Sequence, residues 1–78
     1  MRTSSDITDK TFGRVGQLVA EYARLCGHSQ LEVTHALLAS KTMRNHGYTH
    51  AQKGHLTEDQ GRAAMAVLHY WIRSTNGD

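Results

Sequence analysis

Apolar side chains recur along three stretches of this 78-residue chain at the three- and four-residue spacing of an amphipathic helix. The first stretch carries Phe12, Val15, Leu18, Val19, Tyr22, Leu25 and Cys26. The second carries Val33, Ala36, Leu37, Ser40 and Met43, with Leu31 and Leu38 off the stripe. The third carries Gly61, Ala64, Met65, Leu68, Trp71 and Ile72. We therefore predict an all-α fold, a three-helix bundle with helices at about 7–26, 30–46 and 58–74.

Capping signals mark the ends of these helices. Two pairs have the spacing of a capping box, Ser29 with Glu32 and Thr57 with Gln60. Glycines suited to a left-handed C-cap follow the first two helices, at Gly27 and Gly47. The N-cap candidates of the first helix are Ser5, Asp6 and Thr8. The chain contains no proline, so few breaks within the helices are expected.

The length fits a single domain over residues 1–78, with frayed ends at 1–5 and 75–78 and a connecting loop at 48–56. A core of this size is thin, so association of two copies would bury useful apolar surface. Small residues recur on the helices, at Gly16 with Ala20 and at Gly61 with Ala64. They predict either a close helix crossing within the monomer or the seam of a homodimer.

Composition narrows the class of protein. A lone cysteine, Cys26, excludes an intrachain disulfide, which favours the reducing cytoplasm. No apolar run approaches the roughly 20 residues that span a bilayer, and no hydrophobic segment follows Arg2. We therefore expect a cytoplasmic protein with no membrane contact. The formal net charge of +2 is too small to identify a nucleic-acid binder by itself.

The distribution of charge tells more than the sum, because no Asp or Glu occurs between Glu32 and Glu58. From residue 41 onward this segment carries cations, histidines and hydrogen-bonding side chains, at Lys41, Arg44, Asn45, His46, Tyr48, His50, Lys53 and His55. Such residue types hold phosphates and touch base edges, and they match an acidic protein surface equally well. A third interpretation is an ordinary solvated helix end, with cations that complement the helix dipole.

A DNA-reading helix-turn-helix fits this pattern poorly. Only Gly27-His28-Ser29 gives a turn of the right length, and the second helix would then be the recognition helix. Its first residues include the acidic Glu32, whereas Lys41 and Arg44 lie at its far end. A plain helical hairpin is the better interpretation.

Metal binding and catalysis both lack a motif. Zinc ligand types occur at Cys26, His28, His46, His50 and His55, but their spacing is atypical of a structural zinc site. The three loop histidines resemble the acid and base of a small ribonuclease, yet the segment offers no carboxylate to orient them and no nucleophile motif. We predict no metal site, no cofactor and no enzymatic activity.

The sequence thus predicts a small non-catalytic regulatory or adaptor protein that binds nucleic acid through the basic, histidine-rich segment 41–55. The alternative is a protein–protein interaction module or inhibitor, in the style of phage and plasmid accessory proteins, that docks on an acidic partner surface.

Overall fold

The structure, a computed structural model, describes residues 9–77, with side chains described from residue 13 onward. Within that range the fold is all-α, as predicted. The elements are α1 (Asp9–Cys26), α2 (Gln30–Leu38), α3 (Lys41–Asn45), a 3-10 turn η1 (His50–Gln52) and α4 (Glu58–Thr75). The predicted N-caps at 5–8 and the predicted fraying at 1–5 lie outside the described residues.

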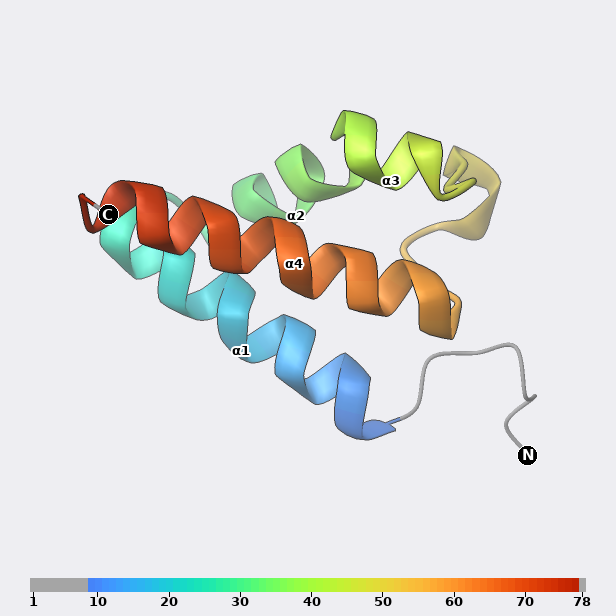
Figure 1. The fold of residues 1–78 in the computed structure, drawn as a ribbon, viewed down its shortest axis with the longest axis horizontal. Coiled ribbons are helices and arrows are strands. Elements are labelled where there is room, and N and C mark those ends of the chain that lie inside the picture. Colours follow the sequence, from blue (N-terminus) through green and yellow to red (C-terminus); the bar gives the residue numbers. More distant parts are fainter. Residues whose placement is uncertain (1–8, 78) are drawn as a thin grey trace.

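The two long helices, α1 and α4, lie side by side and run in the same direction, while α2 and α3 return along α4 (Figure 1). Apolar residues of all four helices meet between these layers. The side chains most completely buried are Leu37 of α2, Met43 of α3 and Leu68 of α4. Most residues of the predicted stripes therefore form the core. The exceptions are Leu25, which is 43% exposed, and Ala36, which is also exposed, while the side chain of Phe12 is not described.

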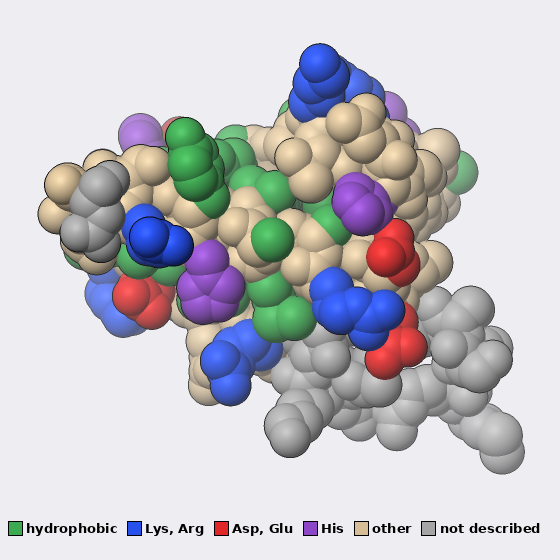
Figure 2. Space-filling view, in the orientation of Figure 1, with side chains coloured by type: hydrophobic (Ala, Val, Ile, Leu, Met, Phe, Trp, Pro, Cys, Tyr) green, Lys and Arg blue, Asp and Glu red, His purple; other side chains and the backbone are tan. Residues whose placement is uncertain are grey.

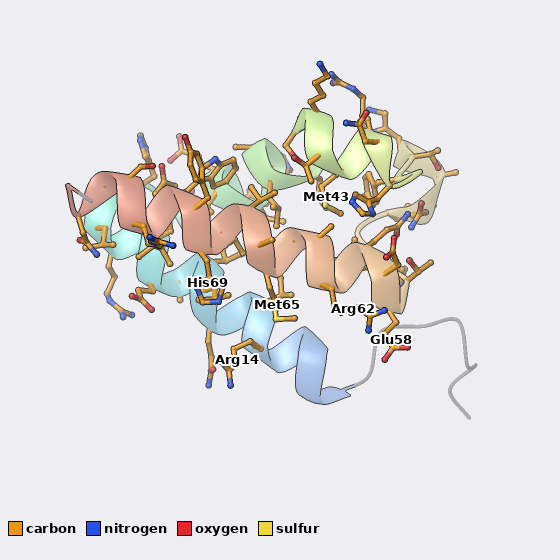
Figure 3. All side chains as sticks on the ribbon, in the orientation of Figure 1. Arg14, Met43, Glu58, Arg62, Met65 and His69 are labelled. Carbon is orange, nitrogen blue, oxygen red and sulfur yellow. The ribbon has the colours of Figure 1, made fainter. Side chains whose placement is uncertain are left out.

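The predicted second helix is broken, so the count of three helices is wrong. Ala39 caps the end of α2, and Ser40 takes an extended conformation with φ −68° and ψ 153°. The Ser40 hydroxyl then accepts a hydrogen bond from the Met43 backbone N–H at 3.3 Å, which starts α3. Serine is a favoured N-cap because its oxygen satisfies a backbone donor that the helix leaves free. The break turns α3 so that Met43 points toward α4 (Figure 3) and is fully buried.

The predicted capping boxes are confirmed. The Ser29 oxygen accepts from Glu32 N, and Glu32 accepts from Ser29 N at 3.0 Å. Thr57 and Gln60 make the corresponding pair at the start of α4. Both loop glycines have the predicted left-handed conformation, with φ +73° at Gly27 and +83° at Gly47. Local sequence therefore decides where these helices begin and end.

The small residues fit the prediction only on α4, where Gly61 and Ala64 are buried. Gly16 is exposed, and a Cβ added there would meet no atom within 4 Å. A close helix crossing at Gly16 is therefore wrong. At the other end of the chain, α4 includes Thr75 and is capped by Asn76, so the predicted fraying begins later than residue 75.

Candidate partner-binding surface

The cations of the predicted site stand on α3. Lys41, Arg44 and Asn45 are exposed, and the Lys and Arg side chains gather over this helix at the top of Figure 2. The Arg44 guanidinium donates a hydrogen bond from Nη1 to the Ala39 carbonyl at 3.2 Å, which holds it over the break between α2 and α3. Among the described residues, neither Lys41 nor Arg44 forms an ion pair. Their charge is therefore available to a partner.

His46 contacts an acid that its own segment lacks. Its Nδ1 lies 2.7 Å from Oδ2 of Asp59 in the first turn of α4. Next to it, Glu58 pairs with Arg62 at 3.6 Å (Figure 3). The segment is acid-free in sequence, but the fold places two carboxylates beside its α4 edge. The basic surface is thus bounded on that side, and His46 connects α3 to α4.

Tyr48, predicted as an exposed contact, belongs to the core. Its side chain is 8% exposed, and its hydroxyl accepts a hydrogen bond from Gly54 N at 2.8 Å. The ring therefore closes the loop from 48 to 54 and is not available for stacking on a base. The prediction that Tyr48 lies on the exposed binding surface is therefore wrong.

A pair of glutamines fixes the rest of the loop. Gln60, 4% exposed, donates from Nε2 to the His46 carbonyl at 3.1 Å and to Gln52 Oε1 at 3.2 Å. Gln52 Nε2 in turn lies 2.7 Å from Gln60 Oε1 and 2.8 Å from the His55 carbonyl. A buried amide of this kind must have partners, because an unsatisfied one costs roughly 1–3 kcal/mol. The sequence predicts Gln60 as a capping residue, but it does not predict the contacts of Gln60 with Gln52 and His46.

Of the predicted site residues in the loop, His50, Lys53 and His55 are exposed. Lys53 has a left-handed backbone, with φ +51° and ψ +40°, and caps η1 by donating its N–H to the His50 carbonyl at 3.1 Å. It is the one described residue other than glycine with a positive φ. This conformation costs a non-glycine residue on the order of 1 kcal/mol.

Between α2 and this loop runs a groove of about 610 Å³. Apolar side chains of α2 and the α2–α3 break form one part of its lining, at Leu31, Leu38 and Ala39. Basic or titratable side chains form another part, at His35, His50 and Lys53. Within residues 9–77, no Asp or Glu lines it. We call these six residues with Lys41 and Arg44 the basic groove surface.

The position of Leu31 explains why the groove cannot be predicted from the sequence alone. It is 66% exposed, and it stands seven residues before Leu38, on the same side of α2. Both leucines lie outside the predicted core stripe. In the sequence they form a second apolar line along a short helix, and this line is the only indication of the groove. Leu31 has its neighbours only because the loop folds back beside α2.

A second set of apolar residues surrounds Trp71. Its ring lies 5.4 Å from that of Tyr22, centroid to centroid, across the α1–α4 contact. The Cys26 thiol beside it, together with partial burial, raises the pKa of the Tyr22 phenol above its usual value of 10.0. Two smaller grooves, of about 320 and 350 Å³, flank Trp71, and neighbouring Tyr70 is 69% exposed. Tyr22 and Trp71 thus pack at the edge of the core, and Tyr70 lies on the surface.

Metal ligands do not converge in the described part of the chain: no three His, Cys, Asp or Glu side chains are grouped to hold an ion. Cys26 is half-buried on α1, and His46 is engaged with Asp59. Although Asp59 supplies His46 with an orienting carboxylate, His46 lines none of the three grooves above.

Comparison with known protein families, curated proteins and solved structures gives no match to this chain. Among the described helices, none is both long and apolar enough to cross a membrane. Functional inference therefore rests on the surface itself.

Proposed function

We propose that this protein is a non-catalytic adaptor or regulatory protein, acting in the cytoplasm, whose basic groove surface binds an acidic region of a partner protein. The observation that carries the proposal is the lining of the groove. Exposed leucine and basic side chains lie together there, and none of the described carboxylates lines it. Apolar contact supplies affinity at a protein interface, and charge complementarity supplies orientation and rate of encounter.

The charges favour an acidic partner. Lys41, Arg44 and Lys53 are exposed and form no ion pair among the described residues. A partner carboxylate would therefore gain an interaction without displacing an existing one. Asp59 and Glu58 limit the surface on the α4 side, so an acidic partner would be directed toward the groove.

Three features make nucleic acid the weaker candidate. The cationic helix α3 has five residues, about 7.5 Å at about 1.5 Å per residue, which covers roughly two base-pair steps. The longer α2, which would be the reading helix after the Gly27 turn, presents Glu32 in its first turn. In addition, Tyr48 is buried, so the loop offers no tyrosine for stacking.

Self-association is part of the proposal. The exposed Tyr70 and the grooves beside Trp71 leave apolar surface on the opposite side of α2 from the basic groove surface. Two copies that cover it would compensate for the thin core. Sedimentation equilibrium measures the mass directly, and a monomer at all concentrations would exclude the dimer.

Affinity capture with charge-reversed variants tests the function. The protein is immobilised and exposed to a nuclease-treated lysate of the cells that produce it, beside Lys41→Glu/Arg44→Glu and a control, Arg14→Glu/Arg24→Glu. The control reverses two exposed arginines of α1, away from the groove. We expect one stoichiometric partner, retained by the control and lost by the α3 variant.

A gel-shift titration with duplex DNA and RNA at about 50 mM salt tests the competing hypothesis that the surface binds nucleic acid. A shift that the α3 double variant abolishes, together with capture that disappears after nuclease treatment, would contradict the proposal and assign the surface to nucleic acid. Retention of the protein partner by the α3 double variant would contradict the role of these cations.

A further inference from the structure

The lining of the groove favours a partner segment that has apolar side chains as well as acidic ones. Leu31 projects from α2 with two thirds of its surface exposed, and Leu38 and Ala39 continue the apolar line toward the start of α3. On a free surface, an isolated exposed leucine needs no explanation. A line of apolar residues in a groove with cations around it is different, because it matches a partner segment that is itself amphipathic.

Lys53 provides an independent indication. Its left-handed backbone is a conformation that glycine or asparagine adopts at lower cost, and Gly54 beside it has φ +86°. At this position the chain carries a lysine, which lines the groove together with His50. The fold thus holds a cation at the groove edge in spite of the backbone strain, and strained positions of this kind cluster at binding sites.

The loop that carries Lys53 is held rigidly enough to form one wall. The Tyr48 hydroxyl accepts from Gly54 N, and Gln52 is bonded to the buried Gln60. These bonds tie the last residue of η1 and the glycine after its cap to buried residues. A preformed wall lowers the entropy lost when a segment binds, so the groove has the character of a site and does not depend on rearrangement of the loop.

From these observations we propose that the groove between α2 and the 48–54 loop binds a short amphipathic acidic helix of the partner protein. Apolar side chains at helical spacing on that segment would cover Leu31 and Leu38, and a flanking carboxylate would pair with Lys53. A helix is the expected form because none of the elements described in residues 9–77 is a strand, so an extended segment would find no sheet edge to join. This inference rests on the proposed function, and it identifies the chemistry of the partner.

A pair of synthetic peptides tests the inference directly. The first, of about 12 residues or roughly three helical turns, carries leucines on one helical face and glutamates on the flanks. The second has the same composition with the leucines spread around the helix. Fluorescence anisotropy should give a Kd for the first peptide at least about tenfold lower than for the second. Amide shifts in NMR spectra should localise it to residues 31–39 and 50–54.

Substitutions separate the groove from the α3 cations. Leu31→Gln should weaken the first peptide about tenfold, because an exposed leucine loses its apolar contact without disturbing the core. Leu25→Gln is the matched control, since Leu25 is also exposed but lies on α1 outside the groove. Lys53→Gly should weaken binding and reduce its salt dependence while relieving the strained backbone. Thermal melts of each variant confirm that it is folded.

The outcomes distinguish this inference from the proposed function. If Lys41→Glu/Arg44→Glu weakens both peptides but Leu31→Gln and Lys53→Gly bind like the parent protein, the groove inference is overturned and the proposed function stands. Equal affinity for the two peptides also overturns the groove inference. If no variant changes either affinity, both are wrong. Tighter binding of a duplex DNA of about 12 base pairs than of the first peptide would overturn both in favour of nucleic acid.

Discussion

The side chain of His46 lies 2.7 Å from Asp59, measured from Nδ1 to Oδ2, and its carbonyl accepts a hydrogen bond from the next residue of α4, Gln60, at 3.1 Å. Two successive residues of α4 therefore hold one residue at the end of α3, by its side chain and by its backbone. The two bonds differ in exposure, since Gln60 is buried and the pair of His46 with Asp59 is open to water. They should therefore differ in strength.

The His46–Asp59 pair is expected to contribute less than about 1 kcal/mol, because its side chains are 39% and 66% exposed. Urea denaturation of His46→Ala, Asp59→Ala and the double variant gives the coupling energy between them. The cycle is needed because Asp59 also stands in the first turn of α4, where a carboxylate favours the helix by itself. A coupling energy well above about 2 kcal/mol would contradict an exposed pair.

Gln60 is expected to contribute more to the stability of the fold than the His46–Asp59 pair. Replacing it with alanine removes the donor to the His46 carbonyl and the partner of Gln52, and it deletes one half of the capping box with Thr57. We expect a loss of about 2–3 kcal/mol in the free energy of unfolding, since buried groups are left without partners. Gln52→Ala is the control: Gln52 is only half-buried, so its loss should be smaller. If urea titrations give the same loss in the free energy of unfolding for both variants, Gln52 contributes as much to the network as Gln60, and the prediction is wrong.

Helix limits were predictable where the signal is local. The Ser29–Glu32 pair, the Thr57–Gln60 pair and Gly27 all act within a few residues of a helix end. The break at Ser40 was not predictable in the same way. Ser40 continues the spacing of Leu37, and a serine inside a helix and a serine at an N-cap have the same sequence signature. What decides is the burial of Met43 against α4, a contact far away in the chain.

The residues of the candidate site also fall into two groups, those predictable from local sequence and those whose role depends on contacts made by the fold. The exposed cations Lys41, Arg44 and Lys53 follow from composition and helical spacing. The roles of His46 and Tyr48 do not, because their partners Asp59 and Gly54 are brought to them by the fold. Leu31 was visible as a leucine off the core stripe, and only the returning loop makes it part of a groove.

The capping box of α2 makes stability sensitive to acid. The backbone N–H of Ser29 and the charge of His28 lower the pKa of the Glu32 carboxyl from its ordinary value of 4.5. A lowered pKa means that the ionised form is favoured in the folded state. Its contribution is therefore present above pH 4.5 and is lost as the pH falls through the lowered value.

Glu32→Gln tests this, because glutamine keeps the hydrogen bond of a capping box but does not titrate. Melting temperatures measured from about pH 7 to pH 3 should fall more steeply for the parent protein than for the variant, with the curves converging in acid. Parallel curves over this range would show that Glu32 carries no ionisation-linked stability.

The left-handed backbone of Lys53 predicts a substitution that stabilises the fold. Glycine pays no steric cost at φ +51°, so Lys53→Gly should raise the free energy of unfolding by up to about 1 kcal/mol, offset in part by the greater freedom of glycine in the unfolded chain. Lys53→Val should lower it, because a β-branched residue fits this region worst.

Ala51→Gly is the matched control two residues earlier, since Ala51 is exposed in η1 and has no positive φ. Urea titrations should show it destabilised by about 0.5–1 kcal/mol, the ordinary cost of a glycine in regular structure. If Lys53→Gly is destabilised by as much as Ala51→Gly, the left-handed turn is not the native one. If instead it is the more stable protein and yet binds the acidic helix less well, its lost affinity cannot be attributed to unfolding, and it must come from the missing ammonium group.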